Sequence, residues 1–449
     1  MLFCLDASPG LSGPDRFDLG ATPRSPLDLF SVSMSSNVSS SSAAALPSVE
    51  PPTRRAGRSA SESAGAAARV RAARALLDAA FGAAPRRAVG TGDAWGSVGV
   101  QADQTHYSDG FALLLGLSRG VAVAARRSRG PSRVAFAPDA VATPFDRTAS
   151  LPHPGGEIVR RVVGGFHSGG ETTASLELAV ISTIPPVLGD AALSALAVAT
   201  AEALLQHGAT RPSPAPLPEA ASGEALARHV TAGSGRPTGT GYALAARAGR
   251  PSALLLVDTA LHEHLVVKEG GERSLRWAVL DPGVEASAGA AVHRQRAQEA
   301  REALDRLRDA GVADIDAFRD LEHRDLDRAV HVLPPSLHAI TRHLVTENRR
   351  VQKHVAALRQ GDGQMVGGLL RMSHASRRAT VGAPAEAIEA LVDDTESLTL
   401  DGTLYGAGAG SRNGAVLVTG RAPAFADGLA RLTEQFETRT GRALRVLRP

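Results

Sequence analysis

Residues 164–175 read Gly-Gly-Phe-His-Ser-Gly-Gly-Glu-Thr-Thr-Ala-Ser and lead into the apolar run Leu-Glu-Leu-Ala-Val-Ile at 176–181. The residues before them, Arg-Arg-Val-Val at 160–163, predict a strand. The stretch itself predicts a glycine-rich turn followed by a helix over 172–183. Such a turn binds anions, because free backbone N–H groups and the positive end of the helix dipole face the ligand. The candidate phosphate-loop residues are Gly169, Gly170, Thr172 and Thr173.

Glu171 stands at the mouth of this predicted anion site. A carboxylate there would repel a phosphate, and a like-charge contact at ~4 Å and an effective dielectric near ~20 costs several kcal/mol. One interpretation makes Glu171 a catalytic acid or base in an altered loop. The other makes it a solvated first-turn carboxylate that caps its helix. The sequence leaves both open.

The composition is that of a globular protein of two or three domains, with 449 residues, 43% hydrophobic and 21% charged. Arginines are scattered and aromatic residues make up only 4%, which argues against a nucleic-acid partner. Cys4 is the only cysteine, so an intramolecular disulfide and cysteine-based metal sites are excluded. No apolar run approaches the ~20 residues of a membrane span, and no secretory signal is visible. We expect a cytoplasmic protein without a membrane partner.

The chain divides by composition into three parts. Residues 1–67 are rich in Ser and Pro and are predicted to be disordered, because they bury too little apolar surface to offset the ordering entropy. Residues 68–232 form the predicted N-terminal domain and 233–449 the predicted C-terminal domain, with a proline-rich connector at 210–219. Further helices are expected over 190–206, 294–310, 336–360 and 423–440, and a tight glycine turn over 406–410. Strands mixed with helices in both halves predict an α+β protein of two domains.

Five segments, taken in order, carry a resemblance to a known family. Thr105-His106-Tyr107-Ser108-Asp109-Gly110-Phe111 resembles His-Thr-Asp-Tyr-Asn-Asp/Gly-Gly-Phe, and residues 169–177 resemble Gly-Leu-Ser-Ser-Ser-Ala-Ser-Leu-Glu. His343-Leu344-Val345-Thr346-Glu347-Asn348-Arg349-Arg350-Val351 resembles His-Val-x-x-Glu-Asn-x-Arg-Val, Met372-Ser373-His374-Ala375-Ser376 resembles Met-x-x-Ser-His-x-Ser-Leu, and residues 406–410 resemble Gly-Ala/Gly-Gly-Phe-Gly. These five patterns are those of galactokinase and the wider GHMP small-molecule kinase superfamily. The resemblance covers residues 68–449.

This resemblance implies a two-domain galactokinase-like fold with the active-site cleft between the domains. It also implies residues that hold a sugar-like substrate: Ser97, Gln104, Tyr107, Asp109 and Gly239. ATP and magnesium are implied only if kinase activity is retained.

Several positions depart from the family pattern. The catalytic Arg of the family falls on Ser97, and its catalytic Asp falls on Tyr242. Its Gly-Glu-His becomes Ala-Asp-Gln at 102–104, and its sugar-contacting Asp becomes His106. The magnesium-binding Glu maps near Val230, with no acid in register.

These departures remove charges that phosphoryl transfer requires, since the transferred group must be neutralised by a metal and cations. A tyrosine is a poor base near neutral pH, given a reference pKa of about 10. The residues present can instead perform acid–base chemistry, with Asp103, His106, Tyr242 and Glu171 as candidate catalytic groups and no metal ligands. The alternative is that His106 and Tyr242 only fill a pocket and have no chemical role.

Three functions follow from the sequence. The first is a repurposed small-molecule enzyme, of specialised metabolism, without ordinary sugar 1-kinase activity. The second is an ATP-dependent kinase of an unusual sugar-like hydroxyl substrate. The third is a non-catalytic pseudokinase that senses a ligand. All three have a small molecule as partner, and the sequence says nothing of oligomeric state. His262 and His264 alternate in a predicted strand, where a surface position is favoured over a metal site.

Overall fold

A computed structural model describes residues 60–84, 88–102, 104–146, 151–168, 174–206, 239–270, 275–284, 290–312, 315–410, 414–447 and 449. They lie within one compact unit, Pro52–Pro449. The segment 1–59 and the connector at 210–219 fall outside the described residues, so the predictions made for them stay predictions.

The larger sheet has the strand order β4-β3-β5-β2-β6-β7, and β1 pairs with β2 off this path. Its strands are β1 (Gly90–Gln101), β2 (Phe111–Arg127), β3 (Arg133–Phe136), β4 (Thr143–Pro144), β5 (Leu176–Ser182), β6 (Leu254–Asp258) and β7 (Glu263–Val267). The two apolar segments expected as separate strands at 111–117 and 120–124 form the single strand β2. The first part of β2, residues 111–115, pairs with β6, and the last part, residues 121–127, pairs with β5. On its other edge β2 pairs antiparallel with nearly the whole of β1.

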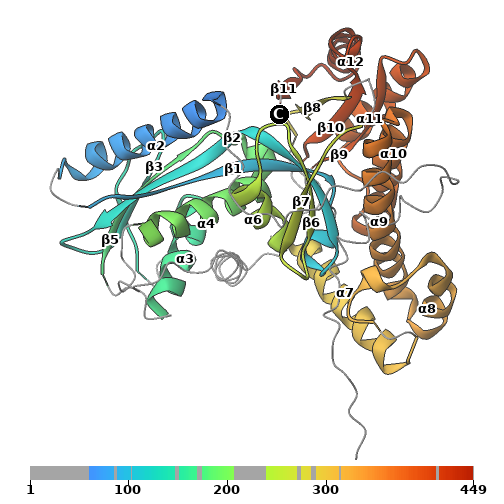
Figure 1. Cartoon of the computed structure of the whole chain (residues 1–449), viewed down its shortest axis with the longest axis horizontal. Coiled ribbons are helices and arrows are strands. Elements are labelled where there is room, and N and C mark those ends of the chain that lie inside the picture. Colours follow the sequence, from blue (N-terminus) through green and yellow to red (C-terminus); the bar gives the residue numbers. More distant parts are fainter. Residues whose placement is uncertain are drawn as a thin grey trace, which may run out of the picture. The chain divides into compact units, whose positions relative to one another are not determined.

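Helices cover both faces of this sheet (Figure 1). The helix α2 (Ala60–Phe81) packs on β2 and β5, and α4 (Gly189–Gln206) packs on β1 and β2 from the other side. The helix α6 (Gly239–Ala248) lies against α4 and β1, and α3 (Gly156–Ser168) lies against α4. The larger sheet is therefore the buried centre of the N-terminal half.

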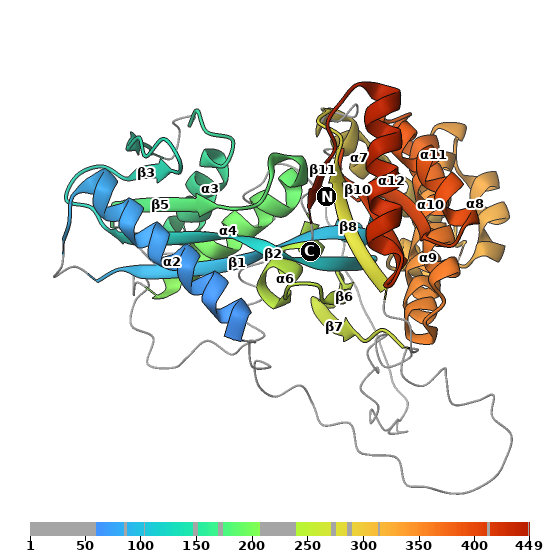
Figure 2. The same ribbon diagram turned by 90° about the horizontal axis from the view of Figure 1, so that it is seen from above.

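The smaller sheet has the order β11-β8-β10-β9 and is built from β8 (Leu275–Asp281), β9 (Leu404–Ala409), β10 (Val416–Arg421) and β11 (Arg445–Leu447). The helices α10 (Gly363–Val381), α11 (Glu386–Leu400) and α12 (Phe425–Thr440) gather beside it (Figure 2). A further apolar core joins α7 (Ala290–Asp309), α8 (Leu326–Val332) and α9 (Pro335–Gln360). The α+β prediction is confirmed.

The segment around the glycine-rich stretch was predicted wrongly. Residues 160–163 lie inside the helix α3, not in a strand, and residues 176–182 form the strand β5, not a helix. In α3, buried Ile158, Val159, Val162 and Phe166 recur at helical spacing. Pairing with β2 on one side and β3 on the other makes 176–182 a strand, and burial removes the alternation that would have revealed it.

Three further boundaries differ from expectation. The helix α2 begins at Ala60, eight residues before the predicted start of order at 68. Residues 404–409 form the strand β9, where a tight turn was expected. The boundary predicted between 232 and 233 does not separate the sheets, because β6 and β7 follow it in sequence yet belong to the larger sheet.

Within the described residues, one helical segment, Pro186–Gln206, is long and apolar enough to cross a membrane. Its apolar window is 78% buried inside the protein. This burial and the contacts of α4 with β1 and α6 are typical of a core helix.

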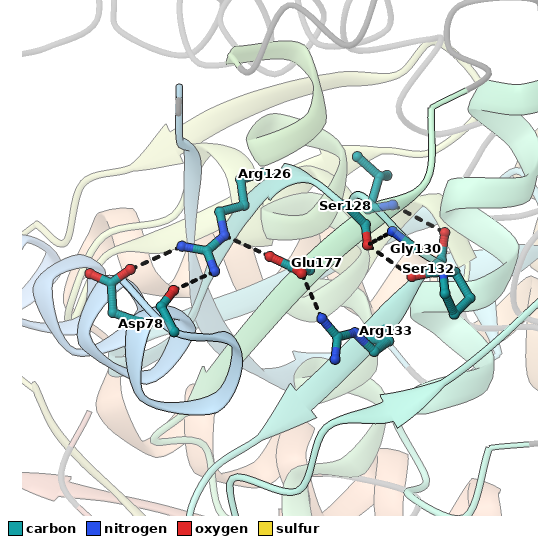
Figure 3. A network of polar contacts seen from close by, with 10 residues as sticks. Asp78, Arg126, Ser128, Gly130, Ser132, Arg133 and Glu177 are labelled. Carbon is teal, nitrogen blue, oxygen red and sulfur yellow. Dashed lines mark hydrogen bonds and ion pairs between the residues drawn. The ribbon is translucent and has the colours of Figure 1, made fainter. Parts of the chain in front are cut away.

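A buried arginine fixes α2 to the far end of the larger sheet (Figure 3). Arg126 of β2 donates to Glu177 of β5 at 2.7 Å, to Asp78 of α2 at 3.1 Å and to the carbonyl of Gly82 at 2.7 Å. Arg133 of β3 donates to the second oxygen of Glu177 at 2.7 Å. Burial alone would raise the pKa of Glu177, but the hydrogen bonds from both arginines outweigh it and hold the pKa below its ordinary value.

A second buried polar network joins α9 to the end of β1. Glu347 is fully buried and accepts hydrogen bonds from Arg350 at 2.7 Å, from Ser373 of α10 at 2.6 Å and from Gln101 of β1 at 3.2 Å. His354, also fully buried, contacts Oε1 of Gln101 through Nδ1 at 2.8 Å. Burial lowers the pKa of His354 to about 3, so this ring is neutral at physiological pH.

Replacement of Glu177 by Ala is expected to lower the free energy of unfolding by about 3–5 kcal/mol, because it leaves the Arg126 guanidinium buried without its main counter-charge. The measurement is urea unfolding of the wild type and the variant. The matched control is Glu302→Ala, which breaks an ion pair with Arg306 whose side chains are 52% and 53% exposed. That loss should stay under about 1 kcal/mol. Equal losses of unfolding free energy in the two variants would contradict the conclusion that the buried Arg126–Glu177 pair stabilises the fold.

Replacement of His354 by Phe is expected to flatten the acid side of the stability profile. The unfolded chain protonates this histidine near pH 6.5 and the folded chain only near pH 3, so the unfolded state binds more protons in between. Stability is therefore lost as pH falls through this window, by up to about 1.4 kcal/mol per pH unit for this one group. Urea unfolding at several pH values measures the difference between wild type and variant.

The control for this experiment is His323→Phe, which removes an exposed histidine. The pH profile of that variant should follow the wild type. A His354→Phe profile that also follows the wild type would show that the buried ring does not titrate as described.

Candidate functional site

The candidate site is built around the second half of β1 and the turn that follows it. Ser97 lies on β1 and is 1% exposed, and Gly99 follows two residues later. The chain leaves β1 at Gln101 and forms a short 3-10 turn over Thr105–Tyr107. β2 then begins at Phe111 and returns alongside β1, so the turn is held between two paired strands.

His106 is buried in this turn, with 2% of its surface exposed. Its Nδ1 lies 2.5 Å from the carbonyl oxygen of Ala102. A carbonyl can only accept, so Nδ1 carries the proton and donates. In the neutral ring Nε2 is then the basic nitrogen, which is the arrangement that prepares a histidine for acid–base work.

Tyr242 of α6 packs edge-on against His106. The ring centroids are 5.1 Å apart at an interplanar angle of 82°. Two glycines permit this approach. A Cβ on Gly241 would lie 3.0 Å from the Cβ of His106, and one on Gly99 would lie 3.0 Å from the Tyr242 hydroxyl. Both distances are tighter than ordinary contacts, so β1 and the start of α6 come together only because these positions lack side chains.

The smaller sheet reaches the same place through the residue after β9. The N–H of Gly99 donates to the carbonyl of Gly410 at 3.1 Å. Gly410 in turn lies against Val98, whose Cγ2 would be 2.8 Å from a Cβ at that position. Elements of both sheets therefore meet near the end of β1.

Gln104 stabilises the turn from within. Its backbone is left-handed, with φ at 62°, and its side chain is fully buried. The Tyr107 hydroxyl donates to Gln104 Oε1 at 3.2 Å, and the Ser108 hydroxyl donates to the Gln104 carbonyl at 2.6 Å. A left-handed non-glycine residue is strained, and such strain persists only where surrounding contacts enforce it.

The structure brings together most of the described site residues predicted from sequence. Ser97, Gln104, His106, Tyr107 and Tyr242 lie on β1, on the turn after it and on α6. Gly239 is the first residue of α6. Asp109 lies in the same turn but is exposed. The other predicted residues fall outside the described part of the chain: Asp103, Gly169, Gly170, Glu171, Thr172 and Thr173.

The helix predicted over 172–183 is wrong where the chain is described, because residues 176–182 form the strand β5; residues 169–173 lie outside the described part of the chain. The strand–turn–helix order that an anion site requires occurs one element later, where β5 leads through a 3-10 turn at Pro186–Leu188 into α4. The side chain of Ile184 would lie 3.0 Å from a Cβ at Gly96, so the approach to this turn lies beside β1. The helix starts with Gly189 and Asp190, followed by Ala, Ala and Leu at 191–193.

The start of α4 does not suit a triphosphate. Asp190 adds a carboxylate to the first turn and is 7% exposed, and the first hydroxyl after Gly189 is that of Ser194, which is 1% exposed. Within the described ranges, no group of three or more His, Cys, Asp or Glu side chains is placed to hold a metal ion. His264 lies exposed on β7, and His262 lies in the turn before it. At the start of α4, the described residues therefore offer a phosphate a like charge and no exposed hydroxyl.

Sequence reasoning missed three residues at this site. Gly99 and Gly410 form the backbone contact between the sheets, and Gln101 holds the end of β1 to α9. For Gln101 a signal was present, since it is the one polar side chain that closes an otherwise apolar segment at 98–102. A buried polar side chain in an apolar strand needs partners, and those partners are distant in sequence.

Comparison with known proteins gives relatives of one kind. No protein-family model matches the chain. Galactokinase of Roseiflexus sp. is 29% identical over 323 residues, covering 70% of this chain and 80% of that protein. Galactokinase of Thermotoga maritima is 26% identical over 353 residues, covering 77% and 93%.

Solved structures agree in fold. Lactococcus lactis galactokinase complexed with galactose superposes with a TM-score of 0.68 at 17% sequence identity, covering 83% of this chain and 96% of that chain. Streptococcus pneumoniae phosphomevalonate kinase, in complex with phosphomevalonate and AMPPNP, gives a TM-score of 0.53 at 10% identity over 80% and 99%. By sequence the chain is similar to galactokinases, and its fold is the galactokinase-like fold of the GHMP small-molecule kinases.

Proposed function

We propose that this chain keeps the galactokinase-like fold but does not carry out ordinary sugar 1-phosphorylation. One observation carries the proposal. The resemblance puts the family's sugar-contacting Asp at His106 and its catalytic Asp at Tyr242, and these two rings pack together at 5.1 Å. Ser97, which stands for the catalytic Arg, lies on the adjacent part of β1. The three positions that carry charge in the family pattern are here a serine, a histidine and a tyrosine, none of which carries a permanent charge.

The size of the rate loss expected from these replacements favours the proposal over the alternative that other residues compensate for them. Phosphoryl transfer depends almost wholly on positioning and on neutralising developing negative charge, and a single arginine at such a centre is worth about 10³–10⁵ in rate. A serine hydroxyl supplies no cation. A phenol with a reference pKa of about 10 is ionised too rarely at neutral pH to replace an aspartate.

The start of α4 supports the same conclusion. In the family pattern a glycine is followed by serines, whose hydroxyls and N–H groups suit phosphate oxygens. At the strand–turn–helix of this chain Gly189 is followed by Asp190 and two alanines. The helix dipole there is offset by a carboxylate of the protein itself, and a phosphate would meet a like charge.

In place of phosphoryl transfer, we propose acid–base chemistry on a small polar molecule, sugar-like or amino-acid-like. The hydrogen bond from Nδ1 to the Ala102 carbonyl leaves Nε2 of His106 as the basic nitrogen, and the phenol of Tyr242 is a weak acid beside it. This combination needs neither a nucleotide nor a metal. The chain would then be a repurposed enzyme of small-molecule, specialised metabolism, acting in the cytoplasm.

Burial favours a second candidate, a non-catalytic ligand sensor. His106 and Tyr242 are only 2% and 7% exposed. Side chains this well packed can serve as the wall of a binding site, or fill the space of a former one, without meeting a substrate. The sensor and the enzyme both exclude sugar kinase activity, and they differ in whether the Tyr242 hydroxyl matters.

The first prediction from this proposal concerns kinase activity. The purified protein, supplied with magnesium, ATP and galactose or a panel of other sugars, is expected to consume no ATP above the sugar-free control. The charged groups that accelerate the transfer are missing from the described site. A coupled ADP assay measures the rate, with a galactokinase run in parallel. Sugar-dependent turnover at roughly 1 s⁻¹ or faster would overturn the proposal. Tight binding of Mg-ATP in a calorimetric titration would also count against it.

The second prediction separates the enzyme from the sensor. Tyr242→Phe keeps the ring that packs on His106 and removes only the hydroxyl. For each sugar or amino acid that raises the melting temperature of the wild type, conversion is followed by NMR. If the pair is catalytic, the variant should convert the compound about 10²–10⁴-fold more slowly while it still binds. The matched control is Tyr405→Phe, on β9, which should behave as the wild type. Unchanged ligand binding without any conversion by the wild type supports the sensor.

A further inference from the structure

The buried end of β1 carries polar groups that the proposed chemistry does not use. Gln101 is 1% exposed and lies between two side chains of α9, Glu347 and His354, both of which are fully buried. Gln101 Nε2 lies 3.2 Å from Glu347 Oε1, and Gln101 Oε1 lies 2.8 Å from His354 Nδ1. Buried polar groups are costly unless paired, so a pairing of this kind has to be specific.

The chemistry of the partners fixes the direction of each hydrogen bond. The carboxylate of Glu347 pairs with Arg350 and accepts from Ser373, so its contact with Gln101 is also as an acceptor. The amide nitrogen of Gln101 must therefore face Glu347, and its oxygen must face His354. Nδ1 of the neutral His354 ring then donates to that oxygen. The orientation of the Gln101 side chain is set by the charge of Glu347.

Gln101 is covalently next to the group that orients His106. The carbonyl of Ala102 accepts from the backbone N–H of His106 at 3.3 Å and from its ring Nδ1 at 2.5 Å. The Ala102 carbonyl lies one residue beyond Gln101, so a displacement of Gln101 at the end of β1 would change the backbone angles of Ala102 and move this carbonyl away from the imidazole. The tautomer of His106 therefore depends on how firmly the end of β1 is held.

The same helix holds the other end of the turn. Asn348, which follows Glu347 on α9, accepts from the backbone N–H of Phe111 at 2.8 Å. Its own amide nitrogen donates to Leu344 within the helix at 2.8 Å. Two successive residues of α9 therefore hydrogen-bond to the two ends of the segment that carries His106, Glu347 to Gln101 and Asn348 to Phe111.

We propose that Gln101 and His354 are positioning residues, which fix the Ala102 carbonyl and thereby the orientation and tautomer of His106. The inference rests on the proposed function only in giving His106 a chemical role. A simple structural role for the pair would stabilise the fold without affecting the imidazole.

The test is the double variant Gln101→Met, His354→Phe. It replaces both buried polar partners by apolar side chains of similar volume, a change that cores tolerate far better than the loss of one partner. The protein is labelled with ¹⁵N-histidine and the ring signals are recorded, with His106 assigned through His106→Asn. We expect the wild-type His106 ring to carry its proton on Nδ1. In the double variant we expect the signals to move toward the mixture of tautomers of an unrestrained histidine.

The matched control is Ser373→Ala, which removes one hydrogen bond of Glu347 and leaves Gln101 in place. Its His106 signals should equal those of the wild type. Unchanged His106 signals in the folded double variant would overturn the proposal, and so would equal shifts in the double variant and in Ser373→Ala. If the double variant does not fold, the single variant Gln101→Met is read by the same criterion.

This readout needs no substrate. A wild type that shows the Nδ1-protonated ring, together with the expected variants, upholds the positioning role even if no conversion of any compound is found. A wild type that converts a compound while its His106 signals are indifferent to Gln101 upholds the proposed function and refutes the positioning role.

Discussion

Close packing along β1 is the constraint on which the rest of the molecule depends. A Cβ at Gly92 would lie 2.0 Å from the carbonyl oxygen of Ala199 in α4, one at Gly96 would lie 3.0 Å from Ile184, and one at Gly99 would lie 3.0 Å from the hydroxyl of Tyr242. Glycines at these positions let α4, the turn before it and α6 approach the same strand. The candidate site exists where it does because β1 presents backbone, instead of side chains, to its neighbours.

Two buried ion pairs stabilise the structure on either side of the candidate site. Arg126 with Glu177 fixes one end of the larger sheet, and the Arg350–Glu347 pair within α9 holds the carboxylate that accepts from Gln101 of β1. Both pairs are buried, so removing one partner is costly. Between these pairs, β1 carries Ser97, and the rings of His106 and Tyr242 pack together beside the end of this strand. A phosphoryl-transfer centre needs its charges at the reacting atoms.

The sequence predicted the fold through its resemblance and through strong helical periodicity. The helix expected over 190–206 is α4, and that over 336–360 is α9. The order of elements around 156–182 was wrong, because Gly164 and Gly165 suggested a turn although both lie inside α3. A glycine in a helix costs only about 1 kcal/mol, and the buried face of α3 outweighs that cost. The following apolar run fits a helix or a doubly buried strand equally well by composition.

The site was predicted in part for a similar reason. The contact of His106 with Tyr242 followed from the register of the resemblance, since the two residues replace groups that act on one substrate. The pairing of Gln101 with His354 did not follow, because 253 positions separate them and neither stands out alone. A long-range polar pair becomes visible only when the strand and the helix are placed in space.

Burial limits what the site can do. The rings of His106 and Tyr242 lie in a medium of low polarity, where an uncompensated triphosphate would be strongly disfavoured. The same medium strengthens hydrogen bonds to a neutral polar molecule and keeps the tautomer of the imidazole well defined. Under the proposed function, the residues at positions 97, 106 and 242 and the contacts that hold His106 act in the same direction. Both favour a centre that orients a proton donor and a proton acceptor over one that stabilises anionic charge.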